Sequence, residues 1–106
     1  MKARFYVICY NYYDERPYSV PHFDRHSTVR FSDLTDALKY ALNDHKNRSG
    51  IFGKNDRTGE ISSYGGCDIL RGKSTNTGIP VMHIHHDGVI EYYSAKAQRV
   101  AEGLAR

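Results

Sequence analysis

Tryptophan is absent from this chain of 106 residues, and cysteine is scarce, with only Cys9 and Cys67. Two cysteines cannot form the several cross-links of a disulfide framework. We therefore expect two reduced thiols in a cytosolic protein. Long hydrophobic runs are also lacking, because no apolar stretch approaches the roughly 20 residues that a membrane-spanning helix needs. The first residues pass directly into a strand pattern, so no signal peptide is expected.

A strong charge of either sign is missing as well. Fifteen basic residues oppose 12 acidic ones, for a formal net charge of +3. That excess is too small to indicate nucleic-acid binding by itself. The chain is 25% charged and 40% hydrophobic, which is typical of a folded globular protein and not of a disordered one. At this length we expect one domain over residues 1–106.

Tyrosine is the residue type in excess, with nine Tyr beside four Phe. Tyrosine favours β-strands because its ring packs well on a pleated surface. It is also enriched at binding surfaces, since it combines a large rigid ring with a polar tip. Tyr-rich strands and a Tyr-rich interface are therefore both open interpretations.

The first half of the chain predicts two strands around a long loop, followed by a helix. Residues 4–13 are apolar on both faces, which favours a central strand. Residues 14–26 are polar and contain two prolines, which predicts a loop, and residues 27–31 predict a short strand. Ser32 is expected to cap a helix that ends near residues 46–48. Its core-facing positions recur at helical spacing and are Leu34, Ala37, Leu38, Ala41 and Leu42.

The second half predicts several short strands and one further helix. Gly65-Gly66 is expected to break or bulge the chain between two of the strands. Asp87-Gly88 is the preferred sequence for a two-residue hairpin turn, and Ser94 is expected to cap the last helix. The strands are expected at residues 51–53, 60–64, 67–70, 79–86 and 89–93. The pattern predicts an α+β fold, with an antiparallel sheet of about five or six short strands and two helices packed on one face.

Three of the six histidines lie within four positions, at His83, His85 and His86. A two-residue turn pairs His83 with Tyr92 and His85 with Ile90. This register predicts His83 and His85 on one face of the hairpin and Tyr93 on the other. The two imidazoles could then hold a divalent metal such as zinc or manganese, with further ligands from elsewhere. The structural alternative is that His83 stacks on Tyr92 while His85 covers Ile90.

The segment His83-Ile84-His85 resembles the His-hydrophobic-His strand of the HUH endonucleases, which nick single-stranded DNA or initiate its rolling-circle replication. The segment Tyr93-Ser94-Ala95-Lys96 resembles the Tyr-x-x-Lys motif of some replication initiators in that family. The resemblance implies that His83 and His85 hold the metal and that Tyr93 attacks a phosphodiester. In that family, however, the tyrosine usually follows well after the histidines, on a separate helix.

Two predicted loops, at residues 12–26 and 71–78, combine basic and aromatic side chains, and we expect them to form the binding surface. Arginine and tyrosine are enriched where proteins bind partners. The predicted partner-binding residues are Arg16, Tyr18, Phe23, Arg25, Arg71 and Lys73.

No catalytic motif accompanies this surface. We therefore expect a non-catalytic cytosolic accessory or inhibitor protein, of the kind that phages and mobile elements carry. It would need no cofactor and would bind a macromolecule, a protein in preference to nucleic acid. The alternatives are a metal-dependent single-strand nuclease built on the two histidines and a homodimer formed through exposed sheet edges.

Overall fold

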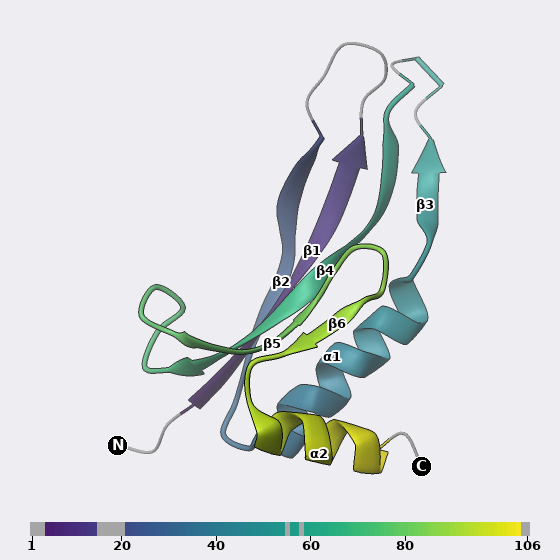
Figure 1. Ribbon diagram of the computed structural model, residues 1–106. Helices are drawn as coiled ribbons and strands as arrows, with labels where there is room; N and C mark the ends of the chain where they lie inside the picture. Colours follow the sequence, from purple (N-terminus) through teal and green to yellow (C-terminus); the bar gives the residue numbers. More distant parts are fainter. Residues whose placement is uncertain (1–3, 15–20, 55, 58, 105–106) are drawn as a thin grey trace.

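The computed structural model describes residues 4–14, 21–54, 56–57 and 59–104. Six strands form one antiparallel sheet in the order β2-β1-β4-β5-β6, with β3 also paired to β4 (Figure 1). The elements are β1 (Arg4–Asp14), β2 (His22–Phe31), α1 (Leu34–Arg48), β3 (Ile51–Lys54), β4 (Ile61–Gly72), β5 (Ile79–Ile84), β6 (Ile90–Tyr92) and α2 (Ala95–Leu104). The α+β fold expected from the sequence is confirmed. No helix in the described part of the chain is long and apolar enough to cross a bilayer.

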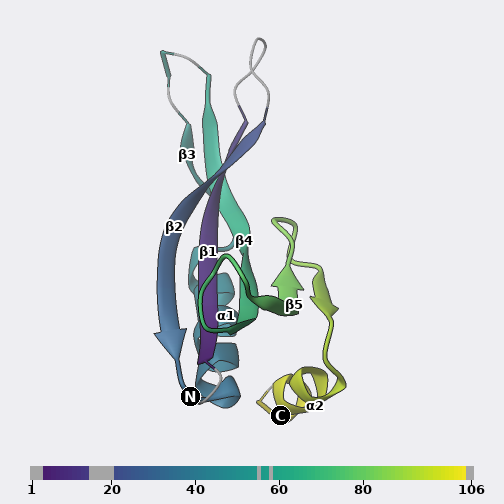
Figure 2. The same cartoon turned by 90° about the vertical axis from the view of Figure 1, so that its left-hand side faces the viewer.

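The hydrophobic core lies between one face of the sheet and the two helices. We call this face the inner face and the opposite one the outer face. In Figure 2, α1 lies behind β1, while the connection after β4 lies in front of it. The sheet contributes Val7, Cys9, Tyr64, Cys67, Ile69, Val81, Met82 and Ile84, and the helices contribute Leu34, Ala37, Leu38, Ala41, Ala97 and Ala101. The predicted stripe of α1 is therefore core, with Leu42 only partly buried at its margin.

The two helix caps follow ordinary hydrogen-bond chemistry, but the first differs from the sequence prediction by one residue. Asp33, and not Ser32, caps α1, because the Asp33 carboxylate accepts a hydrogen bond of 3.1 Å from the Thr35 backbone N–H. A carboxylate at this position also interacts favourably with the helix dipole. Ser94 caps α2 as predicted, since its hydroxyl accepts from the Ala97 backbone N–H at 3.2 Å.

The prediction of a long loop over residues 14–26 is wrong for the second half of that segment. Residues 22–26 belong to β2, which pairs with β1 from Tyr13↔His22 to Phe5↔Phe31, with one irregularity between Cys9 and Tyr10. Although the side chains of this segment are polar, its backbone N–H and C=O groups find hydrogen-bond partners in β1. Both prolines of the segment precede His22, so neither removes a donor from the ladder.

Gly65-Gly66 forms a bulge, one of the two outcomes expected from the sequence, and the strands expected at residues 60–64 and 67–70 are one continuous strand, β4. The register changes there, between Cys9↔Cys67 and Asn11↔Tyr64. Gly66 adopts a φ of +96°, and a Cβ placed on it would lie 2.1 Å from the Ile84 carbonyl oxygen. Only glycine satisfies both the left-handed backbone and this close approach of β5.

The hairpin between β5 and β6 has a different register from the predicted one. Ile84 pairs with Ile90 and His83 with Glu91. The Gly88 N–H donates to the His85 carbonyl at 2.9 Å, and Gly88 has a φ of +92°. This is a three-residue loop with a left-handed glycine, in place of the expected two-residue turn. The register shifts by one residue, which changes the residues that share each face.

The paired ends of β1 with β2, and of β3 with β4, extend beyond the last turn of α1 (Figure 1). At this end of the sheet Phe23, Ile51 and Phe52 are exposed hydrophobic residues. β2 also forms one edge of the sheet. The homodimer expected from exposed sheet edges remains a prediction.

Candidate functional site

Three neighbouring strands bring an aspartate, a histidine and a glutamate side by side on the outer face. Asp68 of β4 pairs with His83 of β5, and His83 pairs with Glu91 of β6. Side chains alternate between the two faces of a strand. Because Ile69, Met82 and Ile84 point into the core, their neighbours Asp68 and His83 point outward.

The first hydrogen-bonded group joins Tyr10, Asp68 and His83. The His83 Nδ1 lies against the Asp68 carboxylate, and the Tyr10 hydroxyl donates to the same carboxylate at 3.1 Å. A carboxylate only accepts, so Nδ1 carries the proton of this contact and leaves Nε2 for another partner. Burial, together with the charge of Asp68, raises the pKa of Tyr10 to about 12. Tyr10 is therefore a neutral donor at physiological pH.

A second group joins His85, Glu91 and Tyr93. The His85 Nε2 donates to Glu91 Oε1 at 2.6 Å, and the Tyr93 hydroxyl donates to Glu91 Oε2 at 2.8 Å. The hydrogen bonds from Tyr93 and His85 lower the pKa of the Glu91 carboxyl, which keeps it ionised. The rings of His83 and His85 meet edge to face, with centroids 4.4 Å apart. The two groups are thus neighbours on one surface.

Aromatic rings form the wall beside this polar network. Tyr12 stacks on His86 with ring centroids 4.7 Å apart and an interplanar angle of 9°. The Phe23 ring is tilted against both, with its centroid 4.9 Å from that of Tyr12 and 6.0 Å from that of His86. Phe23 remains 51% exposed. Arg25 lies opposite Tyr10 in the β1–β2 register. We call Tyr12, Phe23 and His86 the ring cluster.

A pocket of about 290 Å³ lies between the ring cluster and the polar network. It is lined by Tyr10, Phe23, Gly65, Asp68, His83, His85 and His86. Rings, imidazoles and a carboxylate therefore converge on one concave surface, which is the usual character of a ligand site.

The hairpin register corrects three of the expectations about the histidines. Tyr93 lies on the same side as His85, because both bind Glu91, whereas the predicted register placed it on the opposite face. His83 does not pair with Tyr92, since Tyr92 pairs with Met82 and packs against the core. Ile90 likewise packs against the core and is not covered by an outward-facing His85.

The structure divides the predicted partner-binding residues. Phe23 lines the pocket and Arg25 pairs with Tyr10, which also lines it, whereas Arg16 and Tyr18 fall outside the described residues. Arg71 pairs with Phe5 at the far end of β1 from Arg25. Lys73 follows β4, where its carbonyl accepts a hydrogen bond from the Tyr6 hydroxyl at 2.7 Å. Among the described residues, Phe23 and Arg25 pair with the second half of β1, whereas Arg71 pairs with its start.

The sequence prediction missed Tyr10, Asp68 and Glu91. Asp68 carried a signal, because a carboxylate within the apolar run Cys67-Asp68-Ile69-Leu70 needs a partner if it is shielded from water. The sequence could not identify that partner as His83, which comes from another strand.

His83 and His85 each have a carboxylate as hydrogen-bond partner, so their role as metal ligands stays a prediction. Within the described ranges, the group of three side chains whose ligand atoms all lie within 4.8 Å of one another is Cys9, Asp44 and Cys67. That group lies on the inner face. Elsewhere on the sheet, His22 and Asp24 approach each other at 3.9 Å, and His22 stacks on Tyr13.

Comparison with known proteins gives no match. No family model, no curated protein and no solved structure matches this chain.

Proposed function

We propose that the protein is a non-catalytic binding domain that holds a protein partner on its outer face. The observation that carries this proposal is the ring cluster of Tyr12, Phe23 and His86, in which Phe23 is 51% exposed, beside a pocket whose Tyr10 pairs with Arg25. Aromatic residues and arginine supply most of the binding energy in protein interfaces. On this proposal the protein acts in the cytosol as an accessory or inhibitor protein.

The charges of the site favour a protein partner over a nucleic acid. Asp68 lines the pocket, and Glu91 of β6 pairs with His83, which also lines it. Phosphate groups would be repelled by these two carboxylates, whereas a protein can offer them N–H donors or basic side chains. The basic residues do not form a continuous track along β1, because Arg25 pairs with Tyr10, whereas Arg71 pairs with Phe5 and Lys73 follows β4.

Two exposed phenylalanines on different parts of the sheet provide the test. Phe23, in the ring cluster, is 51% exposed, and Phe52 of β3 is 45% exposed. We expect Phe23→Ala to weaken partner binding by about tenfold or more, as for an interface anchor, and Phe52→Ala to leave it unchanged. The measurement is affinity capture from the native host after nuclease treatment, followed by titration of the captured protein.

Equal losses for Phe23→Ala and Phe52→Ala would contradict the assignment of the surface. Capture that disappears on nuclease treatment would identify a nucleic acid and overturn the choice of a protein partner.

A second candidate function is favoured by the shared contact of His85 and Tyr93 with Glu91. In the HUH-like nuclease, His83 and His85 would hold a divalent metal that polarises the phosphate. The Tyr93 oxygen would form a bond to phosphorus as the bond to the leaving sugar oxygen breaks. Glu91 is positioned to accept the phenol proton. Two histidines, a carboxylate and a tyrosine on one surface fit this chemistry.

We expect no cleavage when the protein is incubated with labelled single-stranded DNA and Mg²⁺ or Mn²⁺, because binding is the proposed function. Cleavage that is lost in Tyr93→Phe and in His83→Ala/His85→Ala would replace the proposed function with the nuclease. Tyr92→Phe is the matched control, since Tyr92 packs against the core next to Tyr93.

A further inference from the structure

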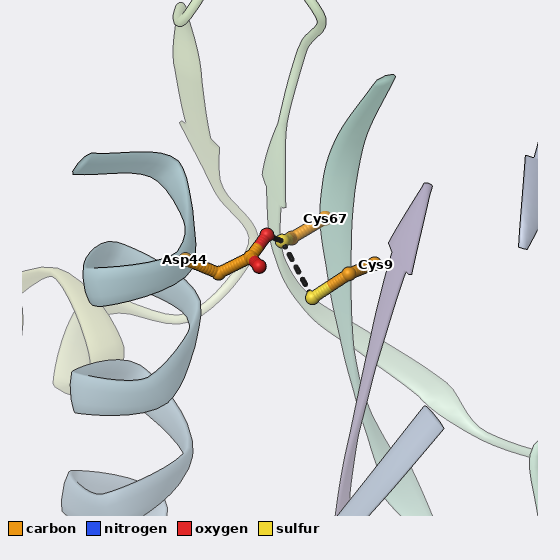
Figure 3. Close-up of side chains that lie close together, drawn as sticks. All are labelled: Cys9, Asp44 and Cys67. Carbon is orange, nitrogen blue, oxygen red and sulfur yellow. Dashed lines mark hydrogen bonds between the residues drawn. The ribbon is translucent and has the colours of Figure 1, made fainter. Parts of the chain in front are cut away.

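The two cysteines lie against one another on the inner face, the opposite side of the sheet from the pocket. Cys9 of β1 pairs directly with Cys67 of β4, and both are fully buried. Their Sγ atoms are 3.1 Å apart, and the Cys67 Sγ is 3.4 Å from Asp44 Oδ2 of α1. Figure 3 shows the three side chains converging from two strands and the helix. The structure thus places two thiols and one carboxylate at a single point.

We propose that Cys9, Cys67 and Asp44 form a binding site for a thiophilic divalent cation, with Zn²⁺ as the best match. Thiolates select zinc over harder ions, and a carboxylate oxygen is a common companion ligand. From the usual bond lengths, a tetrahedral zinc site separates two sulfurs by about 3.8 Å and a sulfur from a carboxylate oxygen by about 3.6 Å. The 3.4 Å from Cys67 to Asp44 is close to that value. The two sulfurs, now 3.1 Å apart, would have to move apart by less than about 1 Å to reach the separation in a zinc site.

The surrounding groups balance the charge of such a site. Arg48 binds Asp44 with two hydrogen bonds, of 2.7 Å and 3.0 Å. Two thiolates and the carboxylate carry three negative charges, which the divalent ion and the Arg48 guanidinium neutralise. Binding releases the two thiol protons to solvent. The Tyr64 hydroxyl lies 3.5 Å from the Cys67 Sγ and is the kind of outer partner that orients a metal ligand.

The ion would connect α1 to the two central strands of the sheet. The proposed site is therefore structural and does not depend on the proposed function of the outer face. Because the ligands are brought together only by folding, bound metal should stabilise the folded chain.

Cobalt(II) is the probe, because thiolate ligands give it a sulfur-to-metal charge-transfer absorption that histidine and carboxylate ligands do not. We expect the reduced, metal-free protein to bind one Co²⁺ per chain with this absorption, and Zn²⁺ to displace it. The absorption should be lost in Cys67→Ser. Asp44→Asn, which keeps the shape of the side chain, should weaken Zn²⁺ binding by about tenfold or more. Zn²⁺ should also raise the Tm of the wild-type protein.

His83→Ala/His85→Ala controls for metal bound at the outer face, and we expect it to keep the sulfur-to-cobalt absorption. Circular dichroism checks that each variant is folded. The proposal is overturned if the reduced wild-type protein lacks the absorption, if Cys67→Ser retains it, or if Asp44→Asn binds Zn²⁺ as tightly as the wild type. It is also overturned if thiol trapping in the native host finds Cys9 and Cys67 joined as a disulfide, since the pair would then be a redox couple.

Discussion

Gly66→Ala should destabilise the protein by more than about 4 kcal/mol, which places it among the most severe single substitutions. A side chain at the left-handed φ of +96° costs about 1–2 kcal/mol. The added Cβ would also lie 2.1 Å from the Ile84 carbonyl oxygen and 3.3 Å from the His85 carbonyl carbon. These atoms are backbone, so relief requires β4 and β5 to separate. The free energy of unfolding, measured with urea and circular dichroism, gives the size of the loss.

Gly103→Ala is the matched control. Gly103 lies in α2, and nothing lies within 4 Å of a Cβ placed there. Alanine in a helix is favoured over glycine by about 0.5–1 kcal/mol, so this variant should be slightly more stable than the wild type. A Gly66→Ala protein as stable as the wild type would show that β5 does not approach the bulge as closely as described.

Arg48→Met should destabilise the metal-free protein by about 2–4 kcal/mol, because it leaves a largely buried carboxylate without its cation. The side chains of Arg48 and Asp44 are 17% and 11% exposed. Arg48 also donates to the Asn11 side chain at 2.7 Å and to the Tyr10 carbonyl at 3.2 Å, which ties the end of α1 to β1. Unfolding in the presence of a chelator and a reductant measures the loss.

The exposed Lys46 in the same helical turn provides the control, and Lys46→Met should change the free energy of unfolding by less than about 0.5 kcal/mol. The Arg48→Met effect should also depend on pH. Burial acts to raise the pKa of Asp44, but the hydrogen bonds and charge of Arg48 outweigh it and lower the pKa. The stabilisation by a carboxylate of lowered pKa is present above the ordinary value of about 3.9 and is lost as the pH falls through the lowered value. A difference between variant and wild type that does not shrink in acid would argue against the ion pair as its cause.

Part of the candidate site was recognisable from residue type alone. The clustering of His83 and His85 and the aromatic character of Phe23 identified residues that line one pocket, and the basic character of Arg25 identified a residue that pairs with Tyr10 of the same pocket. Asp68 and Glu91 were not predicted as site residues, because their place in the site depends on pairing with His83 of a neighbouring strand. Such neighbours follow from pairing between segments distant in sequence, which no local pattern encodes.

The proximity of Cys9, Cys67 and Asp44 on the inner face was likewise not predictable from local sequence patterns. Cys9 and Cys67 read as two unrelated buried thiols in the sequence. Their proximity to Asp44 depends on the β1–β4 register and on the packing of α1 against those strands.

By itself, the sequence determined the features that follow from local periodicity and local hydrogen bonding. These are the helical stripe of α1, the Ser94 cap of α2, the strand-forming segments and hence the α+β fold. Tertiary structure alone decided how the strands pair and therefore which side chains share a face. For the β5–β6 hairpin, the left-handed Gly88 and the burial of Met82 and Ile84 select a register one residue away from the one that Asp87-Gly88 suggested. Since side chains alternate from face to face, that single residue moves Tyr93 to the side of His85.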